Sequence, residues 1–239
     1  MNIYLHPSGV KKELKNDYIG EVWTPWSNTI AYYPLTSATT VNDMSGNNYN
    51  LTNYNSNVTF WTYQWVSCAS FPWSKNGLYK AWFNQLSNSD YTISVWAYRP
   101  STLNQTDTYL LRIWWTTAVK WEDCLLAFNK LRLRFSFRWD DLDSDTNPEW
   151  QWTNIICQFK KSENQQLIYV NWVLKGSRTT AYTHNITDSN ICLWNRYNQS
   201  YTGDNTWWWY LSEVIFENIA WNSTKIEHYY NLTKSNYWL

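Results

Sequence analysis

Glycine is scarce in this sequence. There are six glycines in 239 residues, whereas tryptophan occurs 20 times. Average glycine usage is about 7%, which would give about 17 glycines in a chain of this length. Glycine is the residue that tight turns use where the backbone needs a positive φ. The glycine shortage and the tryptophan excess therefore call for a common explanation.

Charged residues are also few. They make up 16% of the chain, and the formal net charge is zero. A protein that binds nucleic acid or an anionic membrane surface by electrostatics carries an excess of Lys and Arg, so the composition excludes both classes. We therefore predict no nucleic-acid partner.

Long apolar runs are absent. The N-terminal stretch MNIYLHPSGVKKELKNDYIGE has no apolar run of signal-peptide length, and no later window approaches the length of a membrane span. We predict no membrane span and no export by the general secretory route. A virion or an extracellular surface fits as the location, and the cytoplasm remains an alternative.

Cysteine and histidine patterns of the zinc or catalytic kind are absent too. The cysteines lie far apart in separate apolar runs, which predicts buried free thiols, with two disulfides as the alternative; they are Cys68, Cys124, Cys157 and Cys192. The histidines have no Cys, Ser-Gly or carboxylate partner at a recognisable spacing, so we expect surface or incidental roles for His6, His184 and His228.

Short runs of β-forming residues, separated by turn signals, dominate what is present. We expect strands at roughly 29–35, 48–53, 65–71, 91–99, 108–114, 124–128, 131–138, 153–160, 167–174, 177–182, 190–194 and 209–218. The run STKIEHYYNLT near the C-terminus fits one helix, capped by Ser223 or Thr224. This pattern predicts an all-β sandwich over residues 26–239, preceded by an arm at 1–25.

Several motifs carry a resemblance to a known family. In chain order they are AYYPL, NDMSGNNYNLTNY, CASFPWSKNGLY, DYTISVWAYRP, QWTNIICQF, IYVNWVLKGSR, ICLWNRYNQS and WWWYLSEVIFENIAWN, followed by the helical run. Over about 29–235 the chain resembles the laminin-G-like, concanavalin A-like domains of bacterial surface and phage proteins. The resemblance implies an antiparallel jelly-roll β-sandwich with one short C-terminal helix.

The resemblance also implies recognition without catalysis. It points to a carbohydrate-binding or adhesion module of a phage particle or a cell-surface assembly, with a glycan or cell-surface polysaccharide as partner. Residues 1–25 would attach it to other virion or surface proteins. A ligand-free structural or decoration domain is the first alternative, and a glycoside hydrolase of the same fold is the second. Hydrolases of this fold place two glutamates around an aspartate, but no aspartate lies between Glu213 and Glu217, so we predict no catalytic residue.

Two loops hold the candidate binding residues. The polar loop NRYNQSYTGDNT, which would equally suit a plain hairpin loop, offers a sugar site made of Asn195, Tyr197, Tyr201 and Asp204. The run WDDLDSDTNPEW has the alternating aspartates that gather oxygen ligands for calcium, namely Asp141, Asp143 and Asp145, after Asp140. It lacks the glycine and glutamate of an EF-hand loop, and a solvated acidic loop is the alternative.

The resemblance adds a second calcium position. Some related domains bind calcium at a sheet edge, and the matching residues here are Asp43 and Glu213. The aspartate that precedes that glutamate in the family is Ser212 in this chain. Asp43 also suits a turn in which its side chain bonds to its own backbone. No cofactor is required by this interpretation, and calcium is the one to test.

The tryptophans fall into two groups. The resembled family has glycine at Trp73, Trp172, Trp194 and at least one of Trp207, Trp208 and Trp209, whereas Trp96 and Trp152 match family tryptophans. Contexts that would suit glycine equally hold Trp65, Trp114, Trp115, Trp121, Trp139 and Trp150. We hypothesise that the gene comes from a lineage, or its phage, that reads the UGA codon as glycine, and that its translation with a table that reads UGA as tryptophan gives this sequence. The alternative is a tryptophan-rich surface that stacks on sugar rings.

Overall fold

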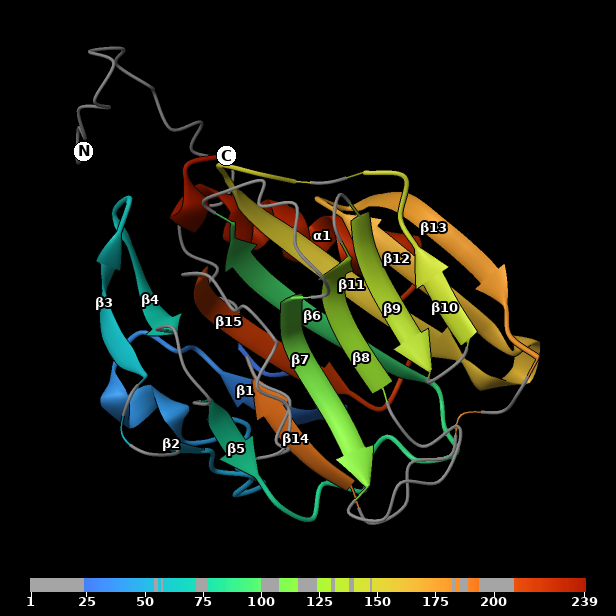
Figure 1. Cartoon of the computed structure of the whole chain (residues 1–239), viewed down its shortest axis with the longest axis horizontal. Coiled ribbons are helices and arrows are strands. Elements are labelled where there is room, and N and C mark those ends of the chain that lie inside the picture. The colour runs from blue at the N-terminus through green and yellow to red at the C-terminus, as the bar shows by residue number, and fades with distance from the viewer. Residues whose placement is uncertain are drawn as a thin grey trace.

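The chain folds into two antiparallel β-sheets packed face to face (Figure 1). The computed structural model describes residues 24–53, 56, 58–71, 77–99, 108–115, 124–129, 132–137, 140–146, 148–181, 184, 189–193 and 209–239. The expected antiparallel jelly-roll β-sandwich is confirmed. The arm at 1–25 lies almost wholly outside the described residues, so its boundary stays a prediction.

One sheet has eight strands, and all its pairings are antiparallel. From one edge to the other, its strands are β13 (Val173–Thr179), β12 (Gln165–Val170), β11 (Trp152–Lys160), β6 (Tyr91–Tyr98), β15 (Trp209–Glu217), β4 (Val66–Phe71) and β3 (Thr59–Tyr63). The eighth strand, β1 (Thr29–Tyr33), pairs with the C-terminal half of β15, beyond the part that pairs with β4.

The other sheet has seven strands. In order they are β10 (Asp140–Asp143), β9 (Arg132–Phe137), β8 (Cys124–Asn129), β7 (Thr108–Trp115), β14 (Ser189–Leu193), β5 (Leu78–Lys80) and β2 (Thr52–Asn53). Figure 1 shows β7 to β10 in front of β6, β11 and β15. The apolar faces of the two sheets meet between them and form the main core.

Alternation along β9 shows how the sequence builds this core. Leu133, Phe135 and Phe137 are buried between the sheets, while Arg132 is exposed. Successive side chains of a strand point to opposite faces, so this alternation places one face inward. Burying a Leu or Phe side chain contributes about 1.5–3 kcal/mol. The four cysteines are all buried and free, as expected.

A helical layer covers part of the outer face of the eight-stranded sheet. It consists of α1 (Ser223–Thr233) and η5 (Lys234–Tyr237), and Figure 1 shows α1 behind the sheet, away from β7 to β10. Asn222, not Ser223 or Thr224, caps α1 by accepting a 2.8 Å hydrogen bond from the Lys225 amide. Short 3-10 helices occur at Ala38–Val41 (η2) and Lys161–Glu163 (η4). No helix within the described ranges is long and apolar enough to cross a membrane.

Two expectations about the strands are wrong, and one strand was not expected. The run 167–174 is not one strand, because the chain turns at Asn171–Trp172 between β12 and β13. The run 65–71 is preceded by β3, which the sequence pattern did not flag. The acidic stretch predicted as a loop contains β10, because arginines on neighbouring strands neutralise its aspartates.

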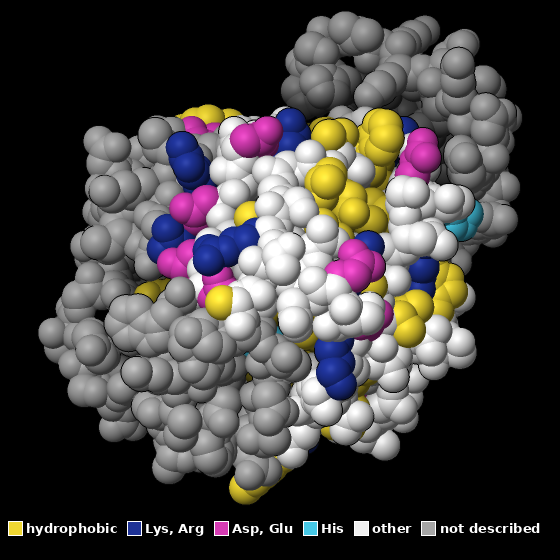
Figure 2. Space-filling model, turned by 90° about the vertical axis from the view of Figure 1, so that its right-hand side faces the viewer, with side chains coloured by type: hydrophobic (Ala, Val, Ile, Leu, Met, Phe, Trp, Pro, Cys, Tyr) yellow, Lys and Arg dark blue, Asp and Glu magenta, His cyan; other side chains and the backbone are white. Residues whose placement is uncertain are grey.

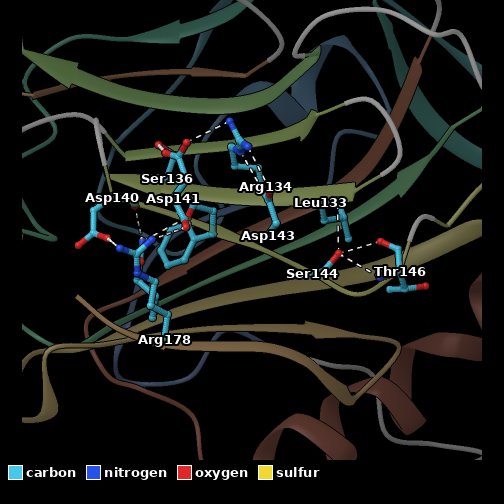
Figure 3. A network of polar contacts seen from close by, with 11 residues as sticks. Leu133, Arg134, Ser136, Asp140, Asp141, Asp143, Ser144, Thr146 and Arg178 are labelled. Carbon is cyan, nitrogen blue, oxygen red and sulfur yellow. Dashed lines mark hydrogen bonds and ion pairs between the residues drawn. The ribbon is translucent and has the colours of Figure 1, made fainter. Parts of the chain in front are cut away.

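Those arginines close one side of the sandwich (Figure 3). Arg134 on β9 pairs with both Asp141 and Asp143 of β10, at 3.0 and 2.7 Å. Arg178 on β13 pairs with Asp140 at 2.5 Å and donates to the carbonyl of Asp141 at 2.7 Å. The Arg134 pairs lie within the seven-stranded sheet. Since β10 and β13 belong to different sheets, the Arg178 contacts join the two sheet edges.

Gly176 permits the close approach of β10 and β13. A Cβ at this position would lie 3.2 Å from the Asp143 carbonyl oxygen and 3.3 Å from Cδ1 of Leu142. Backbone cannot move aside as a flexible side chain can, so the strands would have to separate.

We predict that Gly176→Ala lowers the free energy of unfolding by about 1–2 kcal/mol, because the added methyl group overpacks this junction. Urea unfolding followed by circular dichroism measures the change. Thr179→Ala, at the exposed end of the same strand, is the matched control and should change stability by less than about 0.5 kcal/mol. Equal stability of Gly176→Ala and the parent chain would contradict the assigned contact.

Candidate functional site

The aspartates expected to bind calcium already have partners in the protein. Both Asp141 and Asp143 are ion-paired with Arg134 (Figure 3), and Asp145 lies 3.8 Å from the Lys175 ammonium. Within the described part of the chain, no group of three His, Cys, Asp or Glu side chains is arranged to hold a metal ion. A cation at this position would have to displace an arginine.

Asp43 organises a turn. Its Oδ1 accepts hydrogen bonds from the amides of Tyr32 and Ser45 at 3.0 and 2.9 Å, and its Oδ2 accepts one from the Tyr49 amide at 3.0 Å. The carboxylate thereby ties the segment after β1 back to the strand. This arrangement matches the alternative role as a turn residue.

Glu213 lies on the outer face of β15, beneath α1. Its Oε1 accepts a hydrogen bond from the Tyr229 hydroxyl and its Oε2 accepts one from the Tyr32 hydroxyl at 3.3 Å. Burial of the carboxyl raises its pKa to about 7, and the two hydrogen bonds partly oppose this shift. Its carboxylate is held by one tyrosine of α1 and one of β1.

Glu217, the other half of the considered hydrolase pair, is fully buried. Its Oε2 accepts hydrogen bonds from the Trp221 indole at 2.5 Å and the Lys225 ammonium at 2.6 Å. Its Oε1 accepts one from the Thr29 hydroxyl at 3.1 Å. Both carboxylates of the pair therefore anchor the C-terminal layer, which consists of Trp221 and the helical layer that follows it, to the sheet.

His184 is buried, which removes a surface role and leaves the incidental one of the two roles expected. Its ring stacks on Phe137 at 3.9 Å, and its Nδ1 lies 2.9 Å from the Tyr91 hydroxyl. Burial lowers the pKa of the imidazole to about 3, so the ring is neutral at physiological pH. The polar loop with Asn195, Tyr197, Tyr201 and Asp204 lies outside the described residues, and its role stays a prediction.

Aromatic side chains gather on the outer face of the eight-stranded sheet, beyond the helical layer. We call Trp61, Tyr63, Tyr98 and Tyr210 the aromatic face. Tyr63 stacks on Tyr210 with ring centroids 4.0 Å apart, and Tyr98 meets Tyr63 edge-on at 4.9 Å. Trp61 lies 5.9 Å from Tyr210 and is 48% exposed.

The sequence pattern does not reveal the aromatic face. Its members come from β3, β6 and β15, and each alone resembles an ordinary core aromatic. The alternation in the run TFWTY was the available signal, because Phe60 packs against the main core while Trp61 and Tyr63 point outward.

The surface at the opposite edge of the sheet is different. Figure 2 looks onto the side of β12 and β13 and shows Lys and Arg side chains mixed with Asp and Glu, next to a hydrophobic patch. Trp172, Val173 and Leu174 are exposed on this hairpin. The charges are of both signs, so this side carries no field that would select an anionic partner.

The described tryptophans differ sharply in backbone conformation. Five have positive φ, between 58° and 68°: Trp65, Trp82, Trp150, Trp172 and Trp238. The first four of these are 46–70% exposed. By contrast, Trp96 and Trp152, which match family tryptophans, are buried and have no positive φ.

Two of the positive-φ tryptophans occupy the second position of a two-residue hairpin turn. Gln64 and Trp65 have φ of 47° and 68° between the paired residues Tyr63 and Val66. Asn171 and Trp172 have φ of 47° and 66° between Val170 and Val173. Two consecutive positive φ values are the pattern of a type I′ turn, which strongly prefers Asn-Gly.

The sequence pattern identified some of these tryptophans and not others. Trp65, Trp150 and Trp172 are among the positions suspected from the sequence, whereas Trp82 and Trp238 are not. Three other suspected positions lie in strands, because Trp114 and Trp115 end β7 and Trp209 begins β15. The remaining suspected positions lie outside the described residues: Trp73, Trp121, Trp139, Trp194, Trp207 and Trp208.

No protein-family model and no curated protein matches the chain in sequence. Solved structures do match in fold. The binding domain of Paraclostridial Mosquitocidal Protein 1 aligns with a TM-score of 0.69 and 16% identity, over 85% of this chain and 52% of that chain. The botulinum neurotoxin serotype G binding domain aligns at 0.65 and 16%, over 87% and 52%.

A third similar structure is the botulinum neurotoxin serotype D ligand-binding domain in complex with N-acetylneuraminic acid. It aligns with a TM-score of 0.65 and 12% identity, over 85% of this chain and 50% of that chain. The chain thus spans about half the length of these toxin domains. At this level of identity the likeness establishes a shared β-sandwich fold, and the laminin-G-like resemblance stays a prediction.

We predict that Trp172→Gly raises the free energy of unfolding by about 1 kcal/mol, because glycine relieves a bulky residue of a left-handed backbone conformation. Trp65→Gly should act in the same direction. Thermal unfolding measures both. Trp96→Gly is the control and should destabilise by more than about 3 kcal/mol, since it empties a buried site. A loss of stability in Trp172→Gly would refute the interpretation of the turn.

We predict that the free energy of unfolding falls as the pH rises from about 5 to about 8, by on the order of 2 kcal/mol. The folded-state pKa of Glu213, about 7, lies above its ordinary value of 4.5. Its proton therefore stabilises the fold at low pH, and that contribution is lost as the pH rises through the folded-state value. Urea unfolding across this range measures the slope.

Glu213→Gln should flatten that slope, because the amide cannot ionise. Glu227→Gln, on the exposed side of α1, is the matched control and should keep the parent slope. An unchanged pH dependence in Glu213→Gln would assign the effect to another group.

Proposed function

We propose that the chain is a non-catalytic carbohydrate-binding or adhesion module. The observation that carries this proposal is the shared sandwich fold with toxin binding domains, one of which was solved with N-acetylneuraminic acid. The arrangement of Glu213 and Glu217 supports a module without catalysis, because both carboxylates are held by the C-terminal layer. The proposed partner is a glycan or a cell-surface polysaccharide.

The order of the sequence motifs supports the finer parts of the proposal. These are a laminin-G-like module of a phage particle or a cell-surface assembly, located on a virion or an extracellular surface. Residues 1–25 would attach it to neighbouring proteins. We propose that binding needs no cofactor, because the nominated aspartates have protein partners, and calcium is the metal to test.

We also propose that glycine is the natural residue at a set of the tryptophan positions, through a gene in which UGA encodes glycine. The positive φ at Trp65, Trp150 and Trp172 supports this, since L residues other than Asn and Asp rarely adopt that conformation. The codons of the source gene decide it. UGA at these three positions with UGG at Trp96 and Trp152 is expected, and UGG throughout would overturn it.

The function is tested by binding of the full chain to a glycan array that holds neutral and sialylated oligosaccharides, with EDTA and with added calcium. We expect specific retention of at least one glycan class at the micromolar affinities common for single lectin-like modules, about the same in both buffers. Binding that requires calcium would overturn the cofactor proposal alone.

The alternative function is a ligand-free structural or decoration domain. Absence of binding to every array glycan, by chain that is folded by circular dichroism, would favour it over recognition. Release of reducing sugar from any array glycan would instead favour a glycoside hydrolase.

A further inference from the structure

We propose that the aromatic face is a binding surface for a neutral glycan chain, whose sugar rings stack on Trp61 and Tyr63. This inference rests on the proposed function and assigns it a place and a ligand class. Three features of the surface carry it: rigidly supported rings, an absence of charged residues in the surrounding segment, and a position at an open sheet edge.

The first feature is the support beneath the exposed rings. Tyr63 is half-buried and lies flat on Tyr210, which is itself buried, at 4.0 Å. The Tyr98 ring packs edge-on against Tyr63, and the centroid of Trp152 lies 5.8 Å from that of Tyr98. Rings held in this way lose little conformational entropy when a ligand stacks on them, which favours binding.

The second feature is the chemistry of the surrounding segment. No charged residue occurs between Asp43 and Lys75, a stretch that includes the whole β3–β4 hairpin. Burial raises the pKa values of Tyr98 and Tyr210 to about 12, so these hydroxyls stay neutral. The hairpin segment itself offers no cation to a carboxylate or phosphate, whereas the apolar face of a neutral pyranose matches aromatic rings.

A polar group for orienting hydroxyls lies at the hairpin turn. The side-chain amide of Gln64 donates a 3.1 Å hydrogen bond to the Tyr98 hydroxyl, and Gln64 is exposed. An exposed amide beside aromatic rings gives the combination of stacking and directional hydrogen bonds that a sugar ring requires.

The third feature is the position of the hairpin. Among the described strands, β3 lies at one edge of the eight-stranded sheet, and Figure 1 shows β3 and β4 at the end of the molecule remote from β13. A long glycan chain can therefore run across the rings at this end of the sheet without reaching β13 at the opposite edge. The surface suits the internal sugar units of a glycan chain better than a single terminal sugar.

The glycine hypothesis leaves this surface in place. Trp61 lies within a β-strand and is not among the positive-φ residues. The other three members are tyrosines. Trp65, at the adjoining turn, has a positive φ and is not counted as part of the face.

The experiment measures retention of the full chain on insoluble cellulose and chitin, and on an array of neutral and sialylated oligosaccharides. We expect binding to a neutral glycan, with affinity falling about five- to tenfold in Tyr63→Ala and in Trp61→Ala. Tyr63→Phe keeps the ring and should bind within about twofold of the parent. Circular dichroism confirms that each variant is folded, and the exposed Trp61 keeps the test valid if Tyr63→Ala does not fold.

Trp172→Gly is the matched control, because Trp172 is 46% exposed in the hairpin turn at the opposite edge of the same sheet. It should bind as the parent does. Glycan binding that survives both alanine variants would overturn this site and leave the proposed function standing. Binding confined to sialylated glycans, or to phosphatidylcholine vesicles with loss in the same variants, would overturn the ligand class. No glycan binding at all would overturn both proposals.

Discussion

Burial of both faces of the middle of the eight-stranded sheet is the constraint on which the rest of the structure depends. Every residue of β6 is buried, because one face meets the sandwich core and the other meets the C-terminal layer. Polar groups on the outer face then need partners from that layer. Thr92 donates to the Ile219 carbonyl at 2.7 Å, and Gln158 donates to the Trp221 carbonyl at 2.9 Å. A buried polar group without a partner costs about 1–3 kcal/mol, so these contacts fix the path of the chain into α1.

The extent of the helical layer explains which part of the outer face remains exposed as the proposed binding surface. The stack of Trp96 on Tyr237, with centroids 3.8 Å apart, ties η5 to the middle of the sheet. The aromatic layer continues past this point through Trp152 and Tyr98 to β3, where Trp61 is half exposed. The aromatic face is thus the uncovered end of a layer that is structural elsewhere. Its rigidity comes from the packing that stabilises the fold, and this is why recognition needs no separate loop to order it.

The sequence predicts this fold where local pattern and tertiary environment agree, as along β9, whose alternation marks the buried face correctly. It fails where partners are remote. The aspartates of β10 suggested a solvated loop or a metal site, because Arg134 and Arg178 meet them only in the folded chain. The aromatic face could not be found from spacing, since Tyr63 and Tyr210 are 147 positions apart in the sequence and stack only after β3 and β15 join the same sheet. The turn at Asn171–Trp172 was absorbed into a longer strand, because tryptophan is a β-former and hides a hairpin signal that glycine would have given.

These tryptophans also separate folding from recognition. A bulky side chain in the left-handed region costs about 1–2 kcal/mol, and exposure at 46–70% means that burial of Trp65, Trp82, Trp150 and Trp172 recovers little of it. Neither the fold nor the aromatic face requires these four side chains. The buried pair Trp96 and Trp152 is different, because it contacts the tyrosines that support both the helical layer and the face. Replacing the four exposed tryptophans with glycine leaves the proposed binding surface intact. Replacing Trp96 and Trp152 would remove the rings that support it. The physical roles of the two groups therefore follow from backbone conformation and burial, whichever codons encode them.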